Sequence, residues 1–215
     1  MLHALMDGGA LTASMLSRVA GISPQTASGH LSRLTSAGLV SVEKQGRHRY
    51  HRLASPSVAR MLESIMQVAA ELEPNRSWTD IDPKHIALRK ARTCYDHFAG
   101  NLGVALTDAL VAQEHVELTS EAGLLTDTGV TFLKEIGIDV EAMIVHSTRR
   151  SRRVLCRPCF DWSERRAHLG GAVGAAICVH SFQQGWIRRL EGTRALLITP
   201  TGRRVYREKF GAIIE

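Results

Sequence analysis

Residues 23–40 read SPQTASGHLSRLTSAGLV, a polar run that passes into leucines at helical spacing and then breaks at Gly38. Ser23 suits the N-cap of a helix, where its hydroxyl can accept a backbone N–H. Pro24 suits the first turn, because the N–H that proline lacks would have no helical partner there. The segment therefore predicts a helix over 24–36 that is polar at its start and is closed by a glycine.

The flanking segments predict a compact motif around this helix. Residues 11–21, LTASMLSRVAG, give a short helix that ends at Gly21. Residues 39–53, LVSVEKQGRHRYHRL, alternate apolar and polar positions around a turn at 45–46, which predicts a β-hairpin with a basic tip. Helix, tight turn, helix and hairpin within about 45 residues is the order of a winged helix-turn-helix.

That motif indicates DNA binding, since its second helix enters the major groove and its hairpin lies along the neighbouring backbone. Short polar side chains reach bases and phosphates, and basic ones gain affinity by releasing counterions. The alternative is an amphipathic surface helix followed by an unrelated hairpin, which the ordered combination disfavours. The predicted DNA-binding residues are Ser23, Gln25, Thr26, Ser28, His30 and Arg33 in the helix and Lys44, Arg47, His48 and Arg49 in the hairpin.

Residues 2–73 resemble the ArsR/SmtB family of bacterial repressors. The resemblance implies a homodimeric repressor that leaves its operator when an effector binds, with the helix from Ser57 at the dimer interface. The metal ligands familiar in that family are absent from 12–21 and 57–72, so metal sensing there is not expected. The matching positions are Ser23, Thr26, Ser28, His30, Leu31, Leu34, Ala37 to Val40, Gly46, Arg47 and Tyr50.

The charge is distributed unevenly along the 215 residues, whose net charge is +6. Residues 1–73 carry 7 Lys and Arg against 5 Asp and Glu, residues 74–148 carry 6 against 11, and residues 149–215 carry 14 against 5. An acidic middle between basic ends indicates modules. We expect a DNA-binding and dimerisation domain over 1–73, a linker over 74–84 and a sensor domain over 85–215.

The second domain contains a diverged internal repeat. TCYDHFAGNLGVALTDAL (93–110) is similar to PCFDWSERRAHLGGAVGAAI (158–177), and each continues through a strand pattern and a Thr-x-x-Gly turn into a helix. The repeats extend over about 93–137 and 158–211, by the spacing of these patterns. The sequence thus predicts a mainly α protein with small β-hairpins, an α+β class, with a duplicated C-terminal domain. Matching positions are Cys94 with Cys159 and Asp96 with Asp161.

Three hypotheses concern the role of this duplicated domain. In the first, Cys94 and Cys159 pair to bind a soft metal or metalloid ion or to be oxidised, with Cys156 as a nearby thiol. The arginines of RRSRRVLCRPCF would then favour the thiolates. The alternative is that these cysteines are small buried core residues.

In the second hypothesis the repeat halves enclose a pocket for a small organic anion. The alternative places Phe160 and Trp162 in the core and pairs Asp161 with Arg165 or Arg166. The pocket residues would be Tyr95, His97, Phe98, Phe160, Trp162, Arg165, Arg166 and His168.

In the third hypothesis the domain is structural, and RRSRR (149–153) with Arg203, Arg204 and Arg207 contacts the DNA backbone. A solvated basic face is the alternative for such runs.

Other classes of protein are disfavoured by what the sequence lacks. It has no phosphate-binding glycine loop, no Gly-x-Ser-x-Gly and no His-Glu-x-x-His, so no enzyme is expected. A thiol-redox protein using Cys156 and Cys159, or an architectural DNA protein without specificity, remains the alternative. Without a membrane span or a signal peptide, we expect a cytoplasmic protein whose partners are operator DNA and a second copy of itself.

Overall fold

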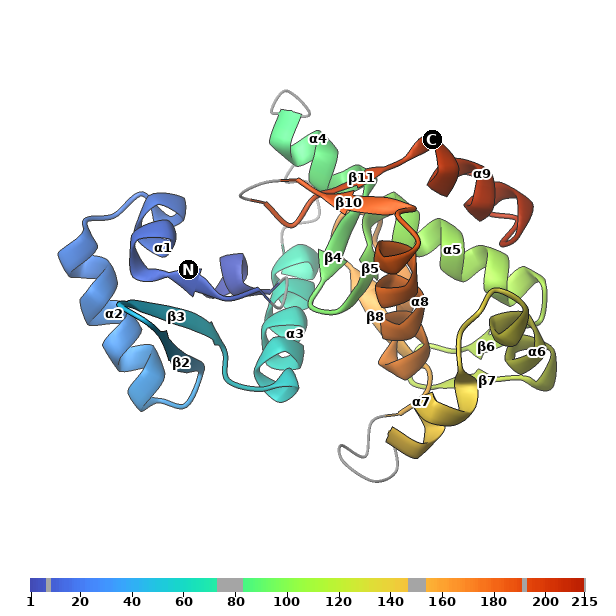
Figure 1. Ribbon diagram of the computed structural model, residues 1–215, viewed down its shortest axis with the longest axis horizontal. Coiled ribbons are helices and arrows are strands. Elements are labelled where there is room, and N and C mark those ends of the chain that lie inside the picture. The colour runs from blue at the N-terminus through green and yellow to red at the C-terminus, as the bar shows by residue number, and fades with distance from the viewer. Residues whose placement is uncertain (7–8, 73–82, 147–153, 191–192, 215) are drawn as a thin grey trace. The chain divides into compact units, whose positions relative to one another are not determined.

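The computed structural model describes residues 1–6, 9–72, 83–146, 154–190 and 193–214. By its contacts the chain divides into two compact units, Met1–Ala69 and Ala70–Glu215. Helices and small antiparallel sheets make up both units (Figure 1), which confirms the expected mixed α+β class. The basic run at 149–153 and most of the expected linker lie outside the described residues.

The first unit is a winged helix-turn-helix. The hydroxyl of Thr12 accepts the N–H of Met15 and caps α1, and Gly21, at φ 64°, ends that helix. The hydroxyl of Ser23 accepts the N–H of Thr26 at 3.1 Å and caps α2, as predicted. The elements are the 3-10 helix η1 (Leu2–Leu5), β1 (Leu11–Thr12), α1 (Ala13–Ala20), α2 (Pro24–Ser36), β2 (Val40–Gln45), β3 (His48–Leu53) and α3 (Pro56–Leu72).

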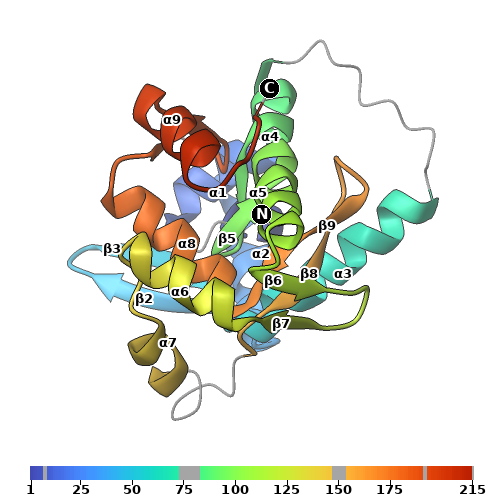
Figure 2. The ribbon, with the colours of Figure 1, turned by 90° about the vertical axis from the view of Figure 1, so that its right-hand side faces the viewer.

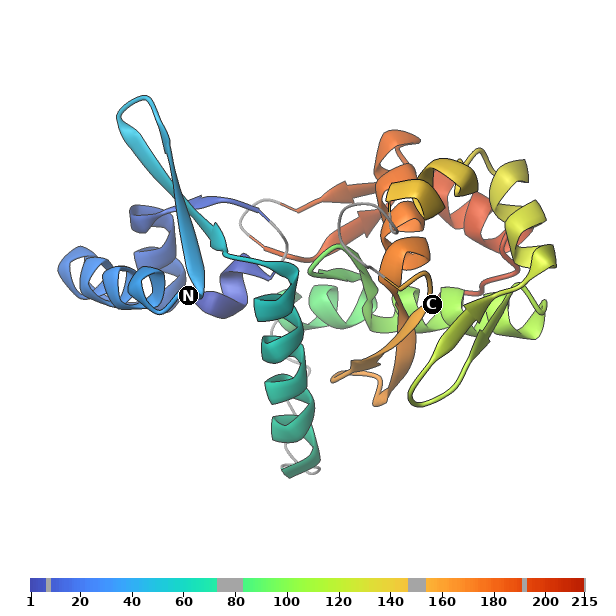
Figure 3. The same cartoon turned by 90° about the horizontal axis from the view of Figure 1, so that it is seen from below.

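Strands β2 and β3 form the predicted hairpin, and Figure 3 shows it extending past the helices of its own unit. The register pairs Gln45 with His48, and Gly46 adopts φ 59° in the turn, a conformation that favours glycine. Strand β1 pairs with the other side of β3, so β3 is the central strand. The helices cover this small sheet with buried side chains that include Leu16 and Leu31. Each such leucine contributes about 1.5–3 kcal/mol by leaving water.

The second unit repeats one order of elements, strand–strand–helix–strand–strand–helix. Figure 2 shows the helices of both repeats. Helix α4 (Pro83–Lys90) precedes the first repeat, and α7 (Val140–His146) lies between the two repeats. The first repeat has β4 (Arg92–Cys94), β5 (His97–Ala99), α5 (Gly100–Ala112), β6 (Val116–Leu118), β7 (Gly123–Leu125) and α6 (Asp127–Glu135). The second has β8 (Arg157–Asp161), β9 (Arg166–Gly170), α8 (Gly171–Gln183), β10 (Ile187–Arg189), β11 (Leu196–Ile198) and α9 (Pro200–Glu208).

The two repeats are intertwined reciprocally. Helix α5 of the first repeat packs against β9 of the second, and α8 of the second packs against β5 of the first. A β-bridge joins Arg92 to Ala195, and a matching one joins Gly123 to Cys156. Both repeats also contribute to one hydrophobic core, with Phe98 and Phe132 from the first and Trp186 and Tyr206 from the second. The core therefore belongs to the pair and to neither repeat alone.

Glycines let each helix lie close to its hairpin. Gly100 and Gly171 begin the two helices at φ 73° and 85°. A Cβ on Gly103 would overlap the carbonyl of Phe98, and one on Gly174 would overlap the carbonyl of Leu169. The Gly-x-x-Gly spacing in both repeats is thus required by backbone proximity, and it holds the start of each helix against the two hairpins.

Candidate functional site

The open face of α2 carries the polar residues that the sequence singles out. Ala27 and Leu31 are buried against the first unit, which turns the opposite face of the helix to solvent. Ser23 and Thr26 also have a local role, since their hydroxyls lie 2.9 Å apart within the cap. All of the predicted helix residues are exposed: Ser23, Gln25, Thr26, Ser28, His30 and Arg33.

The hairpin adds an exposed basic surface at its tip. Lys44, Arg47, His48 and Arg49 are all exposed there. The carboxylate of Glu43 accepts a hydrogen bond from Arg52 at 2.8 Å, so this acid is engaged within the hairpin. The tip is therefore suited to phosphate contacts that depend on salt.

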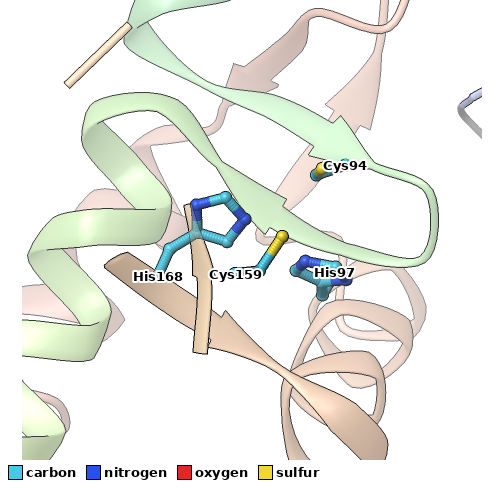
Figure 4. A group of neighbouring side chains, drawn as sticks. All are labelled: Cys94, His97, Cys159 and His168. Atoms are coloured by element: carbon cyan, nitrogen blue, oxygen red, sulfur yellow. The ribbon is translucent and has the colours of Figure 1, made fainter. Parts of the chain in front are cut away.

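In the second unit, two hairpins bring two thiols and two imidazoles together. Cys94 faces His97 across β4 and β5, and Cys159 faces His168 across β8 and β9. Figure 4 shows the four side chains converging on one point from the two hairpins. All four are buried, and one ligand atom from each lies within 4.8 Å of the other three. We call these four residues the Cys–His cluster.

Each histidine of the cluster has an aspartate at its Nδ1 atom. Nδ1 of His97 is hydrogen-bonded to Oδ1 of Asp96 at 3.1 Å. Nδ1 of His168 lies 3.2 Å from Oδ2 of Asp161. A carboxylate at Nδ1 favours the tautomer that carries its proton there, which leaves Nε2 as the lone-pair donor. Asp96 and Asp161, which match in the sequence repeat, therefore lie beside the Nδ1 atoms of His97 and His168.

Asp161 is fixed by a set of buried donors. Arg92 donates to its Oδ1 at 2.8 Å, and the N–H of Gly100 donates to its Oδ2 at 2.6 Å. Burial alone would raise the pKa of Asp161, but His168, Arg92 and Ser163 together hold it below its usual range. The ion pair of Asp161 with Arg165 or Arg166, which was the alternative to an anion pocket, is wrong, because Asp161 pairs with Arg92. Arg166 instead forms a two-bond pair with Asp108 near the surface.

The residues of the anion-pocket hypothesis occupy separate environments. His97 and His168 belong to the Cys–His cluster, whereas Phe98 packs edge-on against Tyr206 in the core. The guanidinium of Arg92 lies 4.5 Å from the centre of the Trp162 ring. Tyr95 and Phe160 are half-buried, and Arg165 and Arg166 are exposed.

An apolar cavity of about 20 Å³ lies between α5 and α8, and of these hypothesised residues Phe98 lines it. That volume holds about one water-sized molecule.

The arginine-rich sequence around Cys156 does not lower the pKa of its thiol. Burial raises the pKa of Cys156 to about 12 and that of Cys178 to about 12. A hydrogen bond with Cys159, together with burial, also raises the pKa of Cys94. The expectation that flanking arginines favour a thiolate is therefore wrong for Cys156, because burial dominates.

Cys156 and Cys159 also lie apart from each other in the packing. Cys156 belongs to the main hydrophobic core, whereas Cys159 packs with Cys94 and Ala99. Residues three apart along an extended strand point to opposite faces. The pair is thus poorly placed to act as a redox Cys-x-x-Cys.

The alignment of the two internal repeats does not reveal that the two histidines are equivalent, and it gives no sign of the role of Arg92. It aligned His97 with Trp162, because both stand three residues after the matching cysteines. The second hairpin is longer, so the cross-strand partner of Cys159 is His168. The signal that could have found it is His-x-x-Gly-x-x-Gly, which occurs at 97–103 and again at 168–174.

The remaining basic residues singled out in the sequence lie on α9. Arg203, Arg204 and Arg207 are exposed there. Among the described residues, no helix is long and apolar enough to cross a membrane.

Known proteins resemble this chain either in its first part or along nearly its whole length. The profile of the MarR family matches residues 1–49. The uncharacterized HTH-type transcriptional regulator YdfF of Bacillus subtilis (strain 168) is 41% identical over 206 residues, which are 94% of this chain and 87% of that protein.

Two solved structures match the first part of the chain. The AntR antimony-specific transcriptional repressor is 32% identical over 34% of this chain and 67% of its own, with a TM-score of 0.31. The homodimeric winged helix-turn-helix domain of Mb0332 from Mycobacterium bovis, a possible ArsR-family regulator, is 32% identical over 33% of this chain and 66% of its own, with a TM-score of 0.29.

The profile is that of the MarR family, whereas the motifs of the first domain resemble ArsR/SmtB, and both are families of winged helix-turn-helix regulators. The full-length similarity to YdfF extends the match through the duplicated unit. The chain belongs to the winged helix-turn-helix transcriptional regulators of MarR/ArsR type.

Proposed function

We propose that this regulator is a homodimeric repressor that reads its operator with α2 and the β2–β3 hairpin. The observation that carries the proposal is the fully exposed polar face of α2, opposite the buried Ala27 and Leu31. Gln25 can bond an adenine edge with both ends of its amide, and Arg33 can reach a guanine or a phosphate. The basic hairpin tip supplies affinity that does not depend on sequence.

We further propose that an effector acting on the second unit releases the repressor from DNA. That unit has its own core and holds the Cys–His cluster, a set of buried polar groups that the first unit does not share. Release requires the effector to favour the conformation that binds DNA poorly, by a free energy equal to the loss of DNA affinity.

The DNA-reading role is tested by replacing Gln25, Thr26 and Arg33 together with alanine. Each lost base contact costs about 1–3 kcal/mol, so operator affinity falls at least tenfold, while affinity for a scrambled duplex changes less. Fluorescence anisotropy on DNA from upstream of the chain's own gene measures both affinities.

The matched control replaces Ser32 and Thr35 with alanine, since both are exposed in the C-terminal half of the same helix. This control retains operator affinity. Unchanged operator affinity in the triple variant would show that α2 does not read the bases of the operator.

A further inference from the structure

We propose that Cys94, His97, Cys159 and His168 bind a single zinc(II) ion in a tetrahedral site, through the two Sγ atoms and the two Nε2 atoms. The site lies wholly within the second unit. The proposal therefore does not depend on DNA binding or on release by an effector.

The donor set matches zinc in number and kind. Two sulfurs and two imidazole nitrogens form one of the common structural zinc sets, and a tetrahedral S₂N₂ site favours zinc among the divalent metals. Zn–S bonds of about 2.3 Å and Zn–N bonds of about 2.0–2.1 Å place tetrahedral ligand atoms roughly 3.3–3.8 Å apart. The four atoms already lie within 4.8 Å of one another, so closure needs a contraction of at most roughly 1.0–1.5 Å.

The ligand side chains are also held in position without an ion. Strand pairing fixes each cysteine opposite its histidine, at Cys94 with His97 and at Cys159 with His168. Asp96, hydrogen-bonded to Nδ1 of His97, holds that ring so that its Nε2 is left for the ion, and Asp161 lies 3.2 Å from Nδ1 of His168. Nε2 of His168 is buried and finds no hydrogen-bond partner among the described residues. A buried polar atom of this kind costs free energy that a metal bond would recover.

The charge of the loaded site suits its burial. When zinc(II) binds, each thiol loses its proton, so one Zn²⁺ replaces two H⁺ and the ion with two thiolates and two neutral imidazoles carries no net charge. A neutral centre avoids the large cost of burying an uncompensated ion. Oxidation of Cys94 with Cys159 to a disulfide would use the two sulfurs and leave both oriented imidazoles without a role.

The test uses the full-length chain, reduced and stripped with a chelator, and titrated with cobalt(II) as a coloured substitute for zinc. We expect saturation at one cobalt per chain, visible d–d bands of tetrahedral intensity and a thiolate-to-cobalt charge-transfer band. Zinc(II) then displaces the cobalt and removes the colour. A faint octahedral spectrum from the reduced wild-type chain, or no binding, would overturn the proposal.

Variants locate the ion. Cys159→Ser and His168→Gln, made separately, each weaken cobalt binding by at least a hundredfold, and Cys159→Ser also weakens the charge-transfer band. Cys178→Ser is the matched control, because this buried cysteine lies on α8 outside the Cys–His cluster. It retains the wild-type spectrum and stoichiometry. A wild-type spectrum in Cys159→Ser would contradict the assignment of Cys159 as a ligand. If that variant does not fold, the wild-type titration and the His168→Gln variant still test the proposal.

Discussion

Asp161 shows how one buried residue can organise a whole site. Its carboxylate accepts hydrogen bonds from Arg92, from the backbone of Gly100 and from Ser163, and it lies beside His168. It thereby joins the end of β8 to β4 and to the start of α5, which come from the other repeat. A charge buried in this way is tolerated only because its partners are in place.

Asp161→Asn is therefore expected to destabilise the second unit by about 3–5 kcal/mol, because Arg92 would keep its buried charge without a counter-ion. Urea unfolding of the chelator-treated chain measures this. Tryptophan fluorescence reports the second unit, because Trp162 and Trp186 lie in it and residues 1–69 contain no tryptophan.

The control for this substitution is Asp108→Asn. The side chains of Arg166 and Asp108 are 59% and 46% exposed, so breaking that pair costs less than about 1 kcal/mol. Equal losses in the two variants would show that the buried pair contributes no more than a surface pair.

At the scale of elements, the two repeats begin their last helices in the same way. Thr126 caps α6 by accepting the N–H of Gly129, and Thr199 caps α9 by accepting the N–H of Gly202. In both places the glycine lies against a carbonyl of the preceding segment, that of His115 or that of Trp186. The Thr-x-x-Gly pattern thus encodes a cap and a close approach together.

Gly202→Ala is expected to cost the second unit more than about 2 kcal/mol, because its Cβ would overlap the carbonyl of Trp186 and the backbone must move. Gly29→Ala is the opposite case, since nothing lies within 4 Å of a Cβ at that position in α2. It should stabilise the first unit by about 0.5–1 kcal/mol through helix propensity. Thermal unfolding followed by circular dichroism compares them, and a neutral Gly202→Ala would contradict the close approach.

Local chemistry made these elements predictable from the sequence. The ends of α2 follow from Ser23, Pro24 and Gly38, and the hairpin follows from alternation around Gly46, because caps and turns involve neighbouring residues. The Cys–His cluster was only half predicted, through Cys94 and Cys159. Its histidines join it through the register of two hairpins of unequal length. Arg92 lies outside the cluster and bonds Asp161, 69 residues away, a contact that no local pattern shows.

At the scale of the whole molecule, α3 presents an apolar stripe that supports the proposed dimer. Met61, Ile65, Val68 and Leu72 are exposed and recur at helical spacing along one face. Exposed apolar stripes of this kind are typical of surfaces that associate.

Ile65→Asp is expected to shift the dimer toward monomer, because a charge in an apolar interface loses its water without gaining a partner. Val19→Asp is the matched control, since Val19 on α1 is 57% exposed, as is Ile65. Analytical ultracentrifugation over a range of concentrations measures both. An association constant that is the same in the two variants would place the dimer interface elsewhere.

The interlocked repeats have a consequence for how this half of the chain can change over evolutionary time. Each hairpin brings one sulfur and one imidazole to the cluster, so a single copy of the repeat has half a coordination sphere and half a core. Losing a cysteine from either copy abolishes the ligand set outright instead of halving it. The two copies are therefore one structural unit, although the rest of their sequences has diverged.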